Sequence, residues 1–557
     1  MTATSLLLLT LLAAPAAGEA PSPTYDLVLR NAVVYDGSGL PPFRGDVAVV
    51  GDRVAALGDL GTERGRRELD LDGLALAPGF INVLSWATES LLVDGRGVAD
   101  VVQGVTLEVF GEGWSMGPVN EAMRQEVLAN QGDLKYEIPW TTLGGYLSHL
   151  ESRGVSVNVA SFVGATTVRI HELGYADRKP TAPELARMQE LVRQAMEEGA
   201  LGLGTSLIYP PAFFADTEEL VALARVAGEH GGVYISHMRS EGDRFLEAID
   251  ELIEISRKGK LPAEIYHLKA AGRPNWDKLP AAITKIEAAR AEGLAITADM
   301  YTYTAGATGL AATMPPWVQE GGQQPFLARL ADPAVRERLR GEMAKASDGW
   351  ENFFLAAGPE KILLVDVRKE ELRPLIGKSL AEAARLRGKD AAETVFDLIV
   401  ENGGDLGAVY FLMSEDNVRK QLTLPWVSFG SDADAPAPEG VFLRSSRHPR
   451  AYGNFARLLG RYVRDEKILP LTEAIRRLTS LPAANLHLEG RGRLAPGFFA
   501  DLVAFDPEKV QDHATFEQPH QLATGVVHVF VNGVQVLAEG RHTGATPGRF
   551  VKRAGVR

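Results

Sequence analysis

The sequence predicts an α/β protein built on a (β/α)8 TIM-like barrel, with a small β-sandwich domain formed from both termini. Through the middle of the chain, helical patterns alternate with short apolar strands, which is typical of a parallel sheet. Both ends are instead rich in strands and turns. The gap between the seventh and eighth predicted strands is far the longest, which indicates an inserted subdomain.

The two ends of the chain carry matching strand patterns. Residues 25–37 alternate in part and end in a turn signal, and residues 46–58 form a hairpin-like pattern around Gly51 and Asp52. Residues 500–506 and 526–536 form a similar set near the C-terminus. We therefore expect one composite β-sandwich domain made of residues 24–76 and 485–557.

The clearest helix in the middle of the chain runs from Thr181 to Gly199. Thr181 is suited to cap it, Pro183 suits its first turn, and Gly199 suits its end. Its apolar residues recur at helical spacing. Further helices are expected at 217–230, 242–258 and 279–292, and each precedes an apolar strand.

Eight strands are expected in the barrel, which we assign to residues 77–484. An insertion at about 305–420, with helical signals at 333–346 and 390–401, is expected to form a lid. Eight is the strand number of a (β/α)8 barrel. The expected strands are residues 76–84, 105–111, 156–162, 201–207, 232–237, 263–268, 294–300 and 426–431.

The amino-acid composition limits the kinds of molecule that the protein is expected to bind. The chain has 557 residues and a net charge of −14, which disfavours nucleic acid as a partner. It contains no cysteine, so disulfides and thiolate metal ligands are excluded. A small-molecule substrate is the expected partner, and the oligomeric state is left open.

The first twenty residues resemble a secretory signal. An apolar run from Leu6 to Ala14 precedes small residues that suit a cleavage site, which predicts an exported protein, periplasmic or secreted. No Lys or Arg precedes the run, which disagrees with this interpretation, and a wrongly assigned start codon is the alternative. The run is too short to span a bilayer, and no later stretch resembles a membrane span.

Several chemically active side chains follow the predicted strands. His237 and His267 end consecutive strands, Glu112 follows the second strand, and Asp432 follows the eighth. In a barrel of this type, the C-terminal strand ends form one rim where function is located. Two imidazoles with carboxylate oxygens predict a divalent metal, with zinc favoured over iron, manganese or nickel.

A set of short motifs resembles the D-aminoacylase (N-acyl-D-amino-acid deacylase) branch of the amidohydrolase superfamily. Each motif is weak alone, but together they are highly specific and cover the chain from about residue 25 to its end. They are Pro78-Gly79-Phe80-Ile81, Gly104-Val105-Thr106, residues 236–243 (SHMRSEGD), residues 267–272 (HLKAAG), Gly430-Ser431-Asp432, His448-Pro449-Arg450, residues 490–501, residues 515–519 and Asn532-Gly533.

The resemblance implies a metal site that departs from the family pattern. The family's tight zinc site uses a cysteine after the second strand and two histidines, which correspond to Gly113, His237 and His267. Glu112 is the expected substitute for the cysteine; a rim carboxylate or a helix cap is its alternative role. The family's second metal uses a His-x-His pair that is Leu84 and Trp86 here. Because these would fill the space with apolar atoms, we expect one metal.

The resemblance also implies a catalytic aspartate and a grip on the substrate carboxylate. Asp432 is the expected proton acceptor; a turn cap is its alternative role, and Asp434 is the local rival. A family serine near Gly306 is Ala307 here, and Thr308 is its possible substitute. The residues expected to bind the substrate carboxylate are Lys269, Arg450, Tyr301 and Tyr209.

The function that the resemblance implies is a one-metal amidohydrolase that cleaves the amide of N-acyl amino acids of D configuration. The alternatives are a hydrolase of dipeptides, cyclic amides or lactones, and a degenerate binding protein without turnover. Leu84 and Trp86 favour the binding protein, whereas the retained His237, His267 and Asp432 oppose it.

Overall fold

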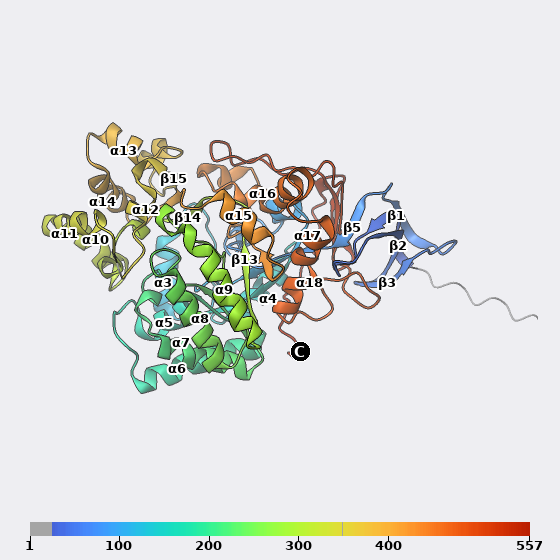
Figure 1. Cartoon of the computed structure of the whole chain (residues 1–557), viewed down its shortest axis with the longest axis horizontal. Helices are drawn as coiled ribbons and strands as arrows, with labels where there is room; N and C mark the ends of the chain where they lie inside the picture. The colour runs from blue at the N-terminus through green and yellow to red at the C-terminus, as the bar shows by residue number, and fades with distance from the viewer. Residues whose placement is uncertain (1–24, 348, 557) are drawn as a thin grey trace, which may run out of the picture.

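The computed structural model describes residues 25–347 and 349–556. Figure 1 shows an elongated molecule with strands β1–β3 at one end, helices α10–α14 at the other and the parallel strands between them. The expected signal segment lies outside the described residues, so export stays a prediction. Among the described helices, none has the length and apolar character needed to cross a membrane.

Both ends of the chain contribute to one nine-stranded sheet. Its order is β21-β20-β19-β18-β5-β1-β2-β3, with β4 paired to β1, so the N-terminal and C-terminal strands meet where β5 pairs antiparallel with β18. The sandwich form and the boundaries of this domain stay predictions. The strands are β1 (Tyr25–Val34), β2 (Phe43–Val50), β3 (Arg53–Gly58), β4 (Gly65–Asp70), β5 (Ala75–Pro78), β18 (Leu502–Phe505), β19 (Val526–Val531), β20 (Val534–Ala538) and β21 (Arg541–His542).

The middle of the chain forms two parallel sheets. One has the order β17-β13-β12-β11-β10-β9 and the other β6-β7-β8. The strands are β6 (Phe80–Asn82), β7 (Val105–Phe110), β8 (Asn158–Ser161), β9 (Val163–Gly164), β10 (Gly202–Ser206), β11 (Val233–His237), β12 (Ala263–Ile265), β13 (Ile296–Met300) and β17 (Val427–Phe429).

The parallel sheets do not pair into the closed barrel that the sequence predicts. An isolated bridge between Ser85 and Ala433 joins one pair of edges, and a hydrogen bond from Leu201 N, just before β10, to Ser161 O in β8 (2.9 Å) joins the other. The expected strand at 76–84 is also divided between sheets. The chain changes sheet at Gly79, where an added Cβ would lie 2.1 Å from Thr106 Oγ1.

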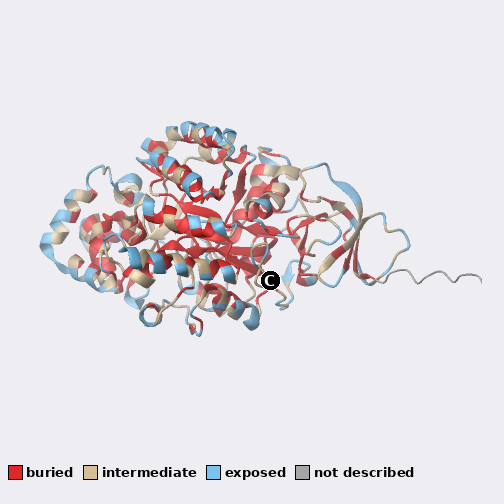
Figure 2. Ribbon diagram, turned by 90° about the horizontal axis from the view of Figure 1, so that it is seen from below, coloured by how far each residue is buried: buried red, intermediate tan, exposed pale blue. Residues whose placement is uncertain are grey.

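Helices cover the parallel sheets, and the strands beneath them are buried (Figure 2). The helix expected at 181–199 is α6, with a capping box between Thr181 and Glu184. These helices are α1 (Ser90–Val93), α2 (Val98–Val101), α3 (Glu121–Asn130), α4 (Leu143–Arg153), α5 (Ala165–Leu173), α6 (Ala182–Glu198), α7 (Thr217–Glu229), α8 (Phe245–Gly259), α9 (Leu279–Ala291), α15 (Glu415–Leu422), α16 (Arg450–Arg457), α17 (Leu471–Leu478) and α18 (Ser480–Asn485).

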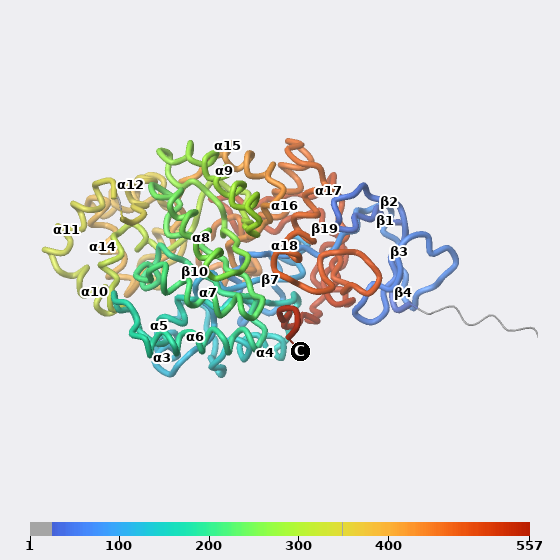
Figure 3. The backbone as a smooth tube through the Cα atoms, turned by 60° about the horizontal axis from the view of Figure 1, so that its bottom comes forward, coloured from blue at the N-terminus to red at the C-terminus, as the bar shows by residue number. Residues whose placement is uncertain are grey.

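The segment between β13 and α15 has its own small sheet and core. The antiparallel strands β14 (Gly306–Gly309), β16 (Gly407–Tyr410) and β15 (Ile362–Asp366) pair in that order. They pack with α10 (Gln323–Ala331), α11 (Pro333–Met343), α12 (Phe353–Ala357), α13 (Leu380–Arg387) and α14 (Ala391–Asn402) around a separate apolar cluster. Figure 3 shows this segment at the end opposite β1–β4.

A buried ion pair connects the nine-stranded sheet with the parallel strands. Asp501 pairs with Arg491, accepts a hydrogen bond from the backbone of Asn532 (2.8 Å) and is 3.3 Å from Asn158 Nδ2 in β8. Asp501 and Arg491 are both buried. Removing one partner of such a pair leaves an uncompensated charge in the interior.

We therefore expect Asp501→Ala to lower the free energy of unfolding by about 3–5 kcal/mol. Asp465→Ala is the control, because Asp465 pairs with Arg464 at the surface and its side chain is 54% exposed. The control should leave stability close to that of the unmodified protein, because exposed ion pairs contribute little. Denaturant unfolding measures the free energy of unfolding of both variants. Equal losses in the two would contradict the stabilising role of the buried pair.

Candidate metal centre

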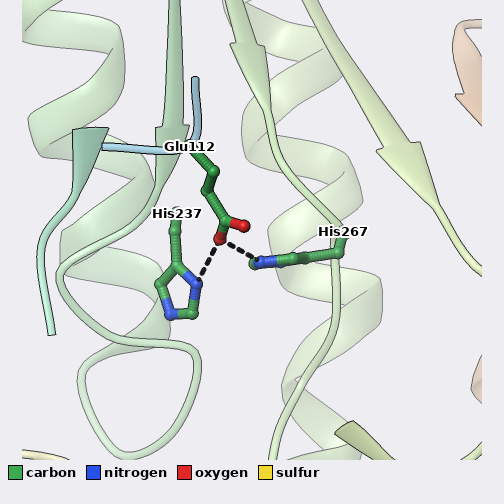
Figure 4. Close-up of side chains that lie close together, drawn as sticks. All are labelled: Glu112, His237 and His267. Atoms are coloured by element: carbon green, nitrogen blue, oxygen red, sulfur yellow. Dashed lines mark hydrogen bonds and ion pairs between the residues drawn. The ribbon is translucent and has the colours of Figure 1, made fainter. Parts of the chain in front are cut away.

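Three buried side chains converge at the ends of β7, β11 and β12 (Figure 4). Oε1 of Glu112 lies 3.0 Å from Nδ1 of His237 and 2.9 Å from Nε2 of His267. Their possible ligand atoms all lie within 4.8 Å of one another. Two imidazole nitrogens and one carboxylate oxygen are a donor set that suits a divalent metal. Glu112 therefore lies with the histidines inside the protein rather than on its rim.

The charge state of Glu112 fits this role. Burial raises the pKa of the Glu112 carboxyl, but the charge of His267 and the hydrogen bonds from His237 and His267 outweigh it and hold that pKa well below its usual range. A metal binds an ionised carboxylate and neutral imidazoles, so an ion here would replace the protons that the two histidines share with Glu112.

The backbone beside Glu112 has no room for a side chain. Gly113 has φ of +72°, and a Cβ added there would lie 2.0 Å from Ser206 Oγ and 2.7 Å from Ser206 N. The left-handed conformation and the close approach of β10 both require glycine. The position that corresponds to the family's cysteine therefore cannot hold a ligand in this backbone.

The two residues at the His-x-His positions have different environments. Leu84 is 1% exposed and packs in the core between the strands. Trp86 is 37% exposed, and its Nε1–H donates to Oε2 of Glu112 at 2.9 Å. Besides the apolar atoms that the sequence analysis expected, Trp86 thus supplies an indole N–H that holds the second oxygen of Glu112.

Glu241 forms the outer layer of the site, and the sequence analysis did not single it out within its motif. Its Oε1 accepts a hydrogen bond from Lys269 Nζ (2.6 Å) and lies 3.0 Å from Nδ1 of His267. Its Oε2 is 3.8 Å from Nε2 of His237, too far for a hydrogen bond. A carboxylate behind a ligand histidine orients the ring and selects its tautomer.

Lys269 is held inside this cluster. Its Nζ also lies 2.7 Å from Nδ1 of His267, so Lys269 and Glu241 compete for that nitrogen. Burial lowers the pKa of Lys269, but the charge of Glu241 outweighs burial and raises the pKa above its usual range. The ammonium group therefore remains charged while it lines the cavity.

Asp432 lines the same cavity from a turn with a left-handed backbone. It has φ of +50°, and its backbone N–H donates to Leu84 O at 2.9 Å. Its carboxylate pairs with Arg450 Nη1 at 2.8 Å. Burial raises the pKa of Asp432, and Arg450 opposes that shift. Non-glycine residues at positive φ persist where the surroundings hold them, and they cluster at functional sites.

Asn82 in β6 helps to hold that turn. Its Oδ1 accepts from the backbone N–H of Ser431 at 2.8 Å, and its Nδ2 donates to Ser431 Oγ at 2.9 Å and to Glu108 Oε2 at 2.8 Å. This network is buried. It fixes Ser431, the residue before Asp432, from the neighbouring strand β6.

A cavity of about 360 Å³ connects most of the predicted site residues. Arg450 does not line it and lies against the ring of Tyr301 instead, with its Cζ 4.6 Å from the ring centroid. Asp434 pairs with Arg447 and lines a different cavity. The lining residues are Trp86, Glu112, Trp114, Ser206, Tyr209, His237, Glu241, His267, Lys269, Tyr301, Gly306, Ala307, Thr308, Phe353, Tyr410, Leu412, Met413 and Asp432.

The segment between β13 and α15 lines part of this cavity and contacts the loop that carries Glu241. Phe353 and Tyr410 from that segment line the cavity. Glu351 accepts from the backbone N–H of Gly242 at 2.7 Å and from that of Glu241. Burial and the charge of Glu241 raise the pKa of Glu351 to about 7.

We expect the purified protein to hold close to one metal ion per chain, and Glu112→Ala to lose it. Loss of an outer partner alone commonly weakens metal binding by ~10–100-fold, and removal of a ligand should cost at least as much. Elemental analysis after gel filtration measures the stoichiometry.

Asp434→Ala is the matched control, because Asp434 is a nearby carboxylate that lines another cavity. It should keep the metal of the unmodified protein. Full metal occupancy in Glu112→Ala would show that Glu112 is not a metal ligand. Two tightly bound metal ions in the unmodified protein would contradict a single metal site.

Comparison with known proteins identifies the family. The amidohydrolase family profile matches residues 67–537. A D-aminoacylase from Alcaligenes xylosoxydans xylosoxydans is 34% identical over 539 residues, which cover 96% of this chain and 99% of that protein.

Two solved structures agree over 95% of this chain and 100% of their own. A D-aminoacylase studied for its binuclear metal centre, with one-metal activation and second-metal attenuation, has a TM-score of 0.79 at 33% identity. An N-acyl-D-glutamate deacylase from Bordetella bronchiseptica, complexed with zinc and a phosphonate mimic of the tetrahedral intermediate, has a TM-score of 0.78 at 29% identity. The chain therefore belongs to the amidohydrolase family, in the D-aminoacylase branch that its motifs predict.

Proposed function

We propose that this protein is a metal-dependent hydrolase that cleaves the amide bond of N-acyl-D-amino acids to a carboxylate and a free amino acid. The observation that carries the proposal is the buried cluster of Glu112, His237 and His267, which opens on a cavity shared with Asp432 and Lys269. Relatives named for this activity match the chain over nearly its whole length, which supports the substrate class and its D configuration.

The metal that we propose is a single zinc ion, held by Glu112, His237 and His267. The zinc complex of the Bordetella bronchiseptica relative supports this identity. Such an ion would polarise the scissile carbonyl and lower the pKa of water. Trp86 supports a single ion, because its N–H occupies the carboxylate oxygen of Glu112 that would otherwise be free for a second one.

Asp432 is the proposed general base and acid. It lines the same cavity as the histidines, and burial raises the pKa of its carboxyl while the charge of Arg450 opposes that shift. It would take the proton of the attacking water and deliver it to the leaving nitrogen. Its pairing with Arg450 holds the carboxylate in place during both transfers.

The amino-acid half of the substrate would lie toward Lys269, Tyr301 and Tyr209. All three line the cavity, and Lys269 keeps its positive charge for the substrate carboxylate. Thr308 is hydrogen-bonded to Tyr209 and stands beside Ala307, where the family has a serine. Arg450 would hold Asp432 and Tyr301 in position through its ion pair and its ring contact. It would not touch the substrate, because it does not line the cavity.

The finer architecture also belongs to this proposal. We propose that the two parallel sheets together form the (β/α)8 barrel, with the Ser85–Ala433 bridge at one join. The inserted segment would act as its lid. Its contribution of Phe353 and Tyr410 to the cavity supports that role.

The function is tested with paired substrates that differ in one feature. The unmodified protein should hydrolyse an N-acyl-D-amino acid in a metal-dependent manner and should act poorly on its L enantiomer and on the matching neutral amide. Lys269→Met should raise KM more than it lowers kcat, because it removes a charge that binds the ground state. Equal rates on neutral amides would favour a lactone or cyclic-amide substrate, and no turnover with full metal occupancy would favour a binding protein.

Asp432→Asn should retain the metal and lose most of its turnover, because an amide cannot accept the proton of water. General base catalysis commonly contributes ~10²–10⁴-fold, so kcat should fall by at least that order. Asp434→Asn is the control and should keep kcat within a few-fold, since Asp434 faces another cavity. A near-normal kcat in Asp432→Asn would show that another group accepts the proton of the attacking water.

A further inference from the structure

We propose that an apolar cavity beside the catalytic cavity binds the acyl chain of the substrate, and that its natural substrates carry acyl groups longer than acetyl. This inference rests on the proposed function. The cavity has a volume of about 430 Å³, within the range of ~300–1,000 Å³ that small-molecule sites occupy. Its apolar lining includes Trp86, Trp114, Met116, Met123, Val127 and Ile138.

Two tryptophans form the boundary between this cavity and the catalytic one. Trp86 and Trp114 line both cavities. Each is 37% exposed, and they are the only exposed tryptophans in the described part of the chain. Large apolar surface left open beside a buried polar site marks a place for an apolar ligand group.

The position of this boundary fits the geometry of an amide substrate. Trp86 and Trp114 follow β6 and β7, whereas Lys269 and Tyr301 follow β12 and β13. Glu112 lies between these groups, bonded to Trp86 on one side and to His267 on the other. With the scissile carbonyl at the ligand cluster, the amino-acid half extends toward Lys269 and the acyl half toward the tryptophans.

The side chains that line the two cavities differ in polarity, in agreement with this orientation of the substrate. The catalytic cavity contains charged groups, including Glu241, Lys269 and Asp432, which suit a carboxylate and an amide. The cavity beyond the tryptophans is walled mainly by apolar and aromatic side chains, including Met123 and Val127 of helix α3 and Tyr136, Ile138 and Trp140. An acetyl group would leave it empty, while a longer aliphatic or aromatic acyl group would bury its carbon atoms there.

The test is a series of N-acyl derivatives of one D-amino acid, from acetyl to octanoyl. For the unmodified protein, kcat/KM should rise by about three- to fourfold for each added methylene until the cavity is full. Met123→Trp places a larger side chain in the cavity, away from the ligands, and should bring the octanoyl-to-acetyl ratio of kcat/KM toward one. Val127→Phe, at a residue that is 38% exposed, is a second filling variant that leaves the core packing intact.

Leu128→Trp is the matched control, because Leu128 lies on the same helix, is 42% exposed and does not line the cavity. The control should keep the chain-length dependence of the unmodified protein. Rates that are flat or fall with chain length in the unmodified protein would overturn the acyl site and leave the proposed function standing. An unchanged ratio in both folded filling variants would also overturn it.

Failure of the proposed function is recognised separately, as the absence of hydrolysis at every chain length. In that case, binding of octanoate and acetate, measured by quenching of tryptophan fluorescence, decides the role of the cavity. Tighter binding of octanoate that Val127→Phe weakens would support an apolar-chain site. Equal or undetectable binding of both acids would overturn it.

Discussion

The carboxylate of Glu112 has both of its oxygens committed, and the geometry of the site depends on that. Oε1 faces the two histidines, while Oε2 accepts the indole N–H of Trp86. A glutamate reaches this point from β7 because the following residue is a glycine that lets β10 approach. The proposed metal site and the tryptophan that bounds the two cavities therefore meet at one side chain, that of Glu112.

Charged groups in the site occur as internally balanced pairs. Lys269 is matched by Glu241, and Asp432 by Arg450, all of them largely buried. Burying charges costs several kcal/mol for each ion unless partners and hydrogen bonds compensate. These pairs hold the side chains in fixed positions before substrate arrives, and such preorganisation is how an enclosed site stabilises developing charge.

The sequence was sufficient for the features that follow from chain order. Strand ends placed His237, His267 and Asp432 on one rim, and the motifs indicated the correct branch of the family. It could not show the hydrogen bond between Trp86 and Glu112, because the neighbouring residues do not indicate which way the indole ring of Trp86 points. The division of the expected first strand at Gly79 and the withdrawal of Arg450 from the cavity likewise depend on contacts between distant segments.

The crowding at Gly113 also bears on how the ligand set could change during evolution. A cysteine there would bring its Cβ against both the hydroxyl and the backbone nitrogen of Ser206. Shortening Ser206 removes only the first of these contacts, so no pair of point substitutions at these two positions restores a thiolate ligand without displacing β10. A cysteine at position 113 would therefore require a shift of the β10 backbone, whereas Glu112 places its carboxylate beside the two histidines with β10 where it lies.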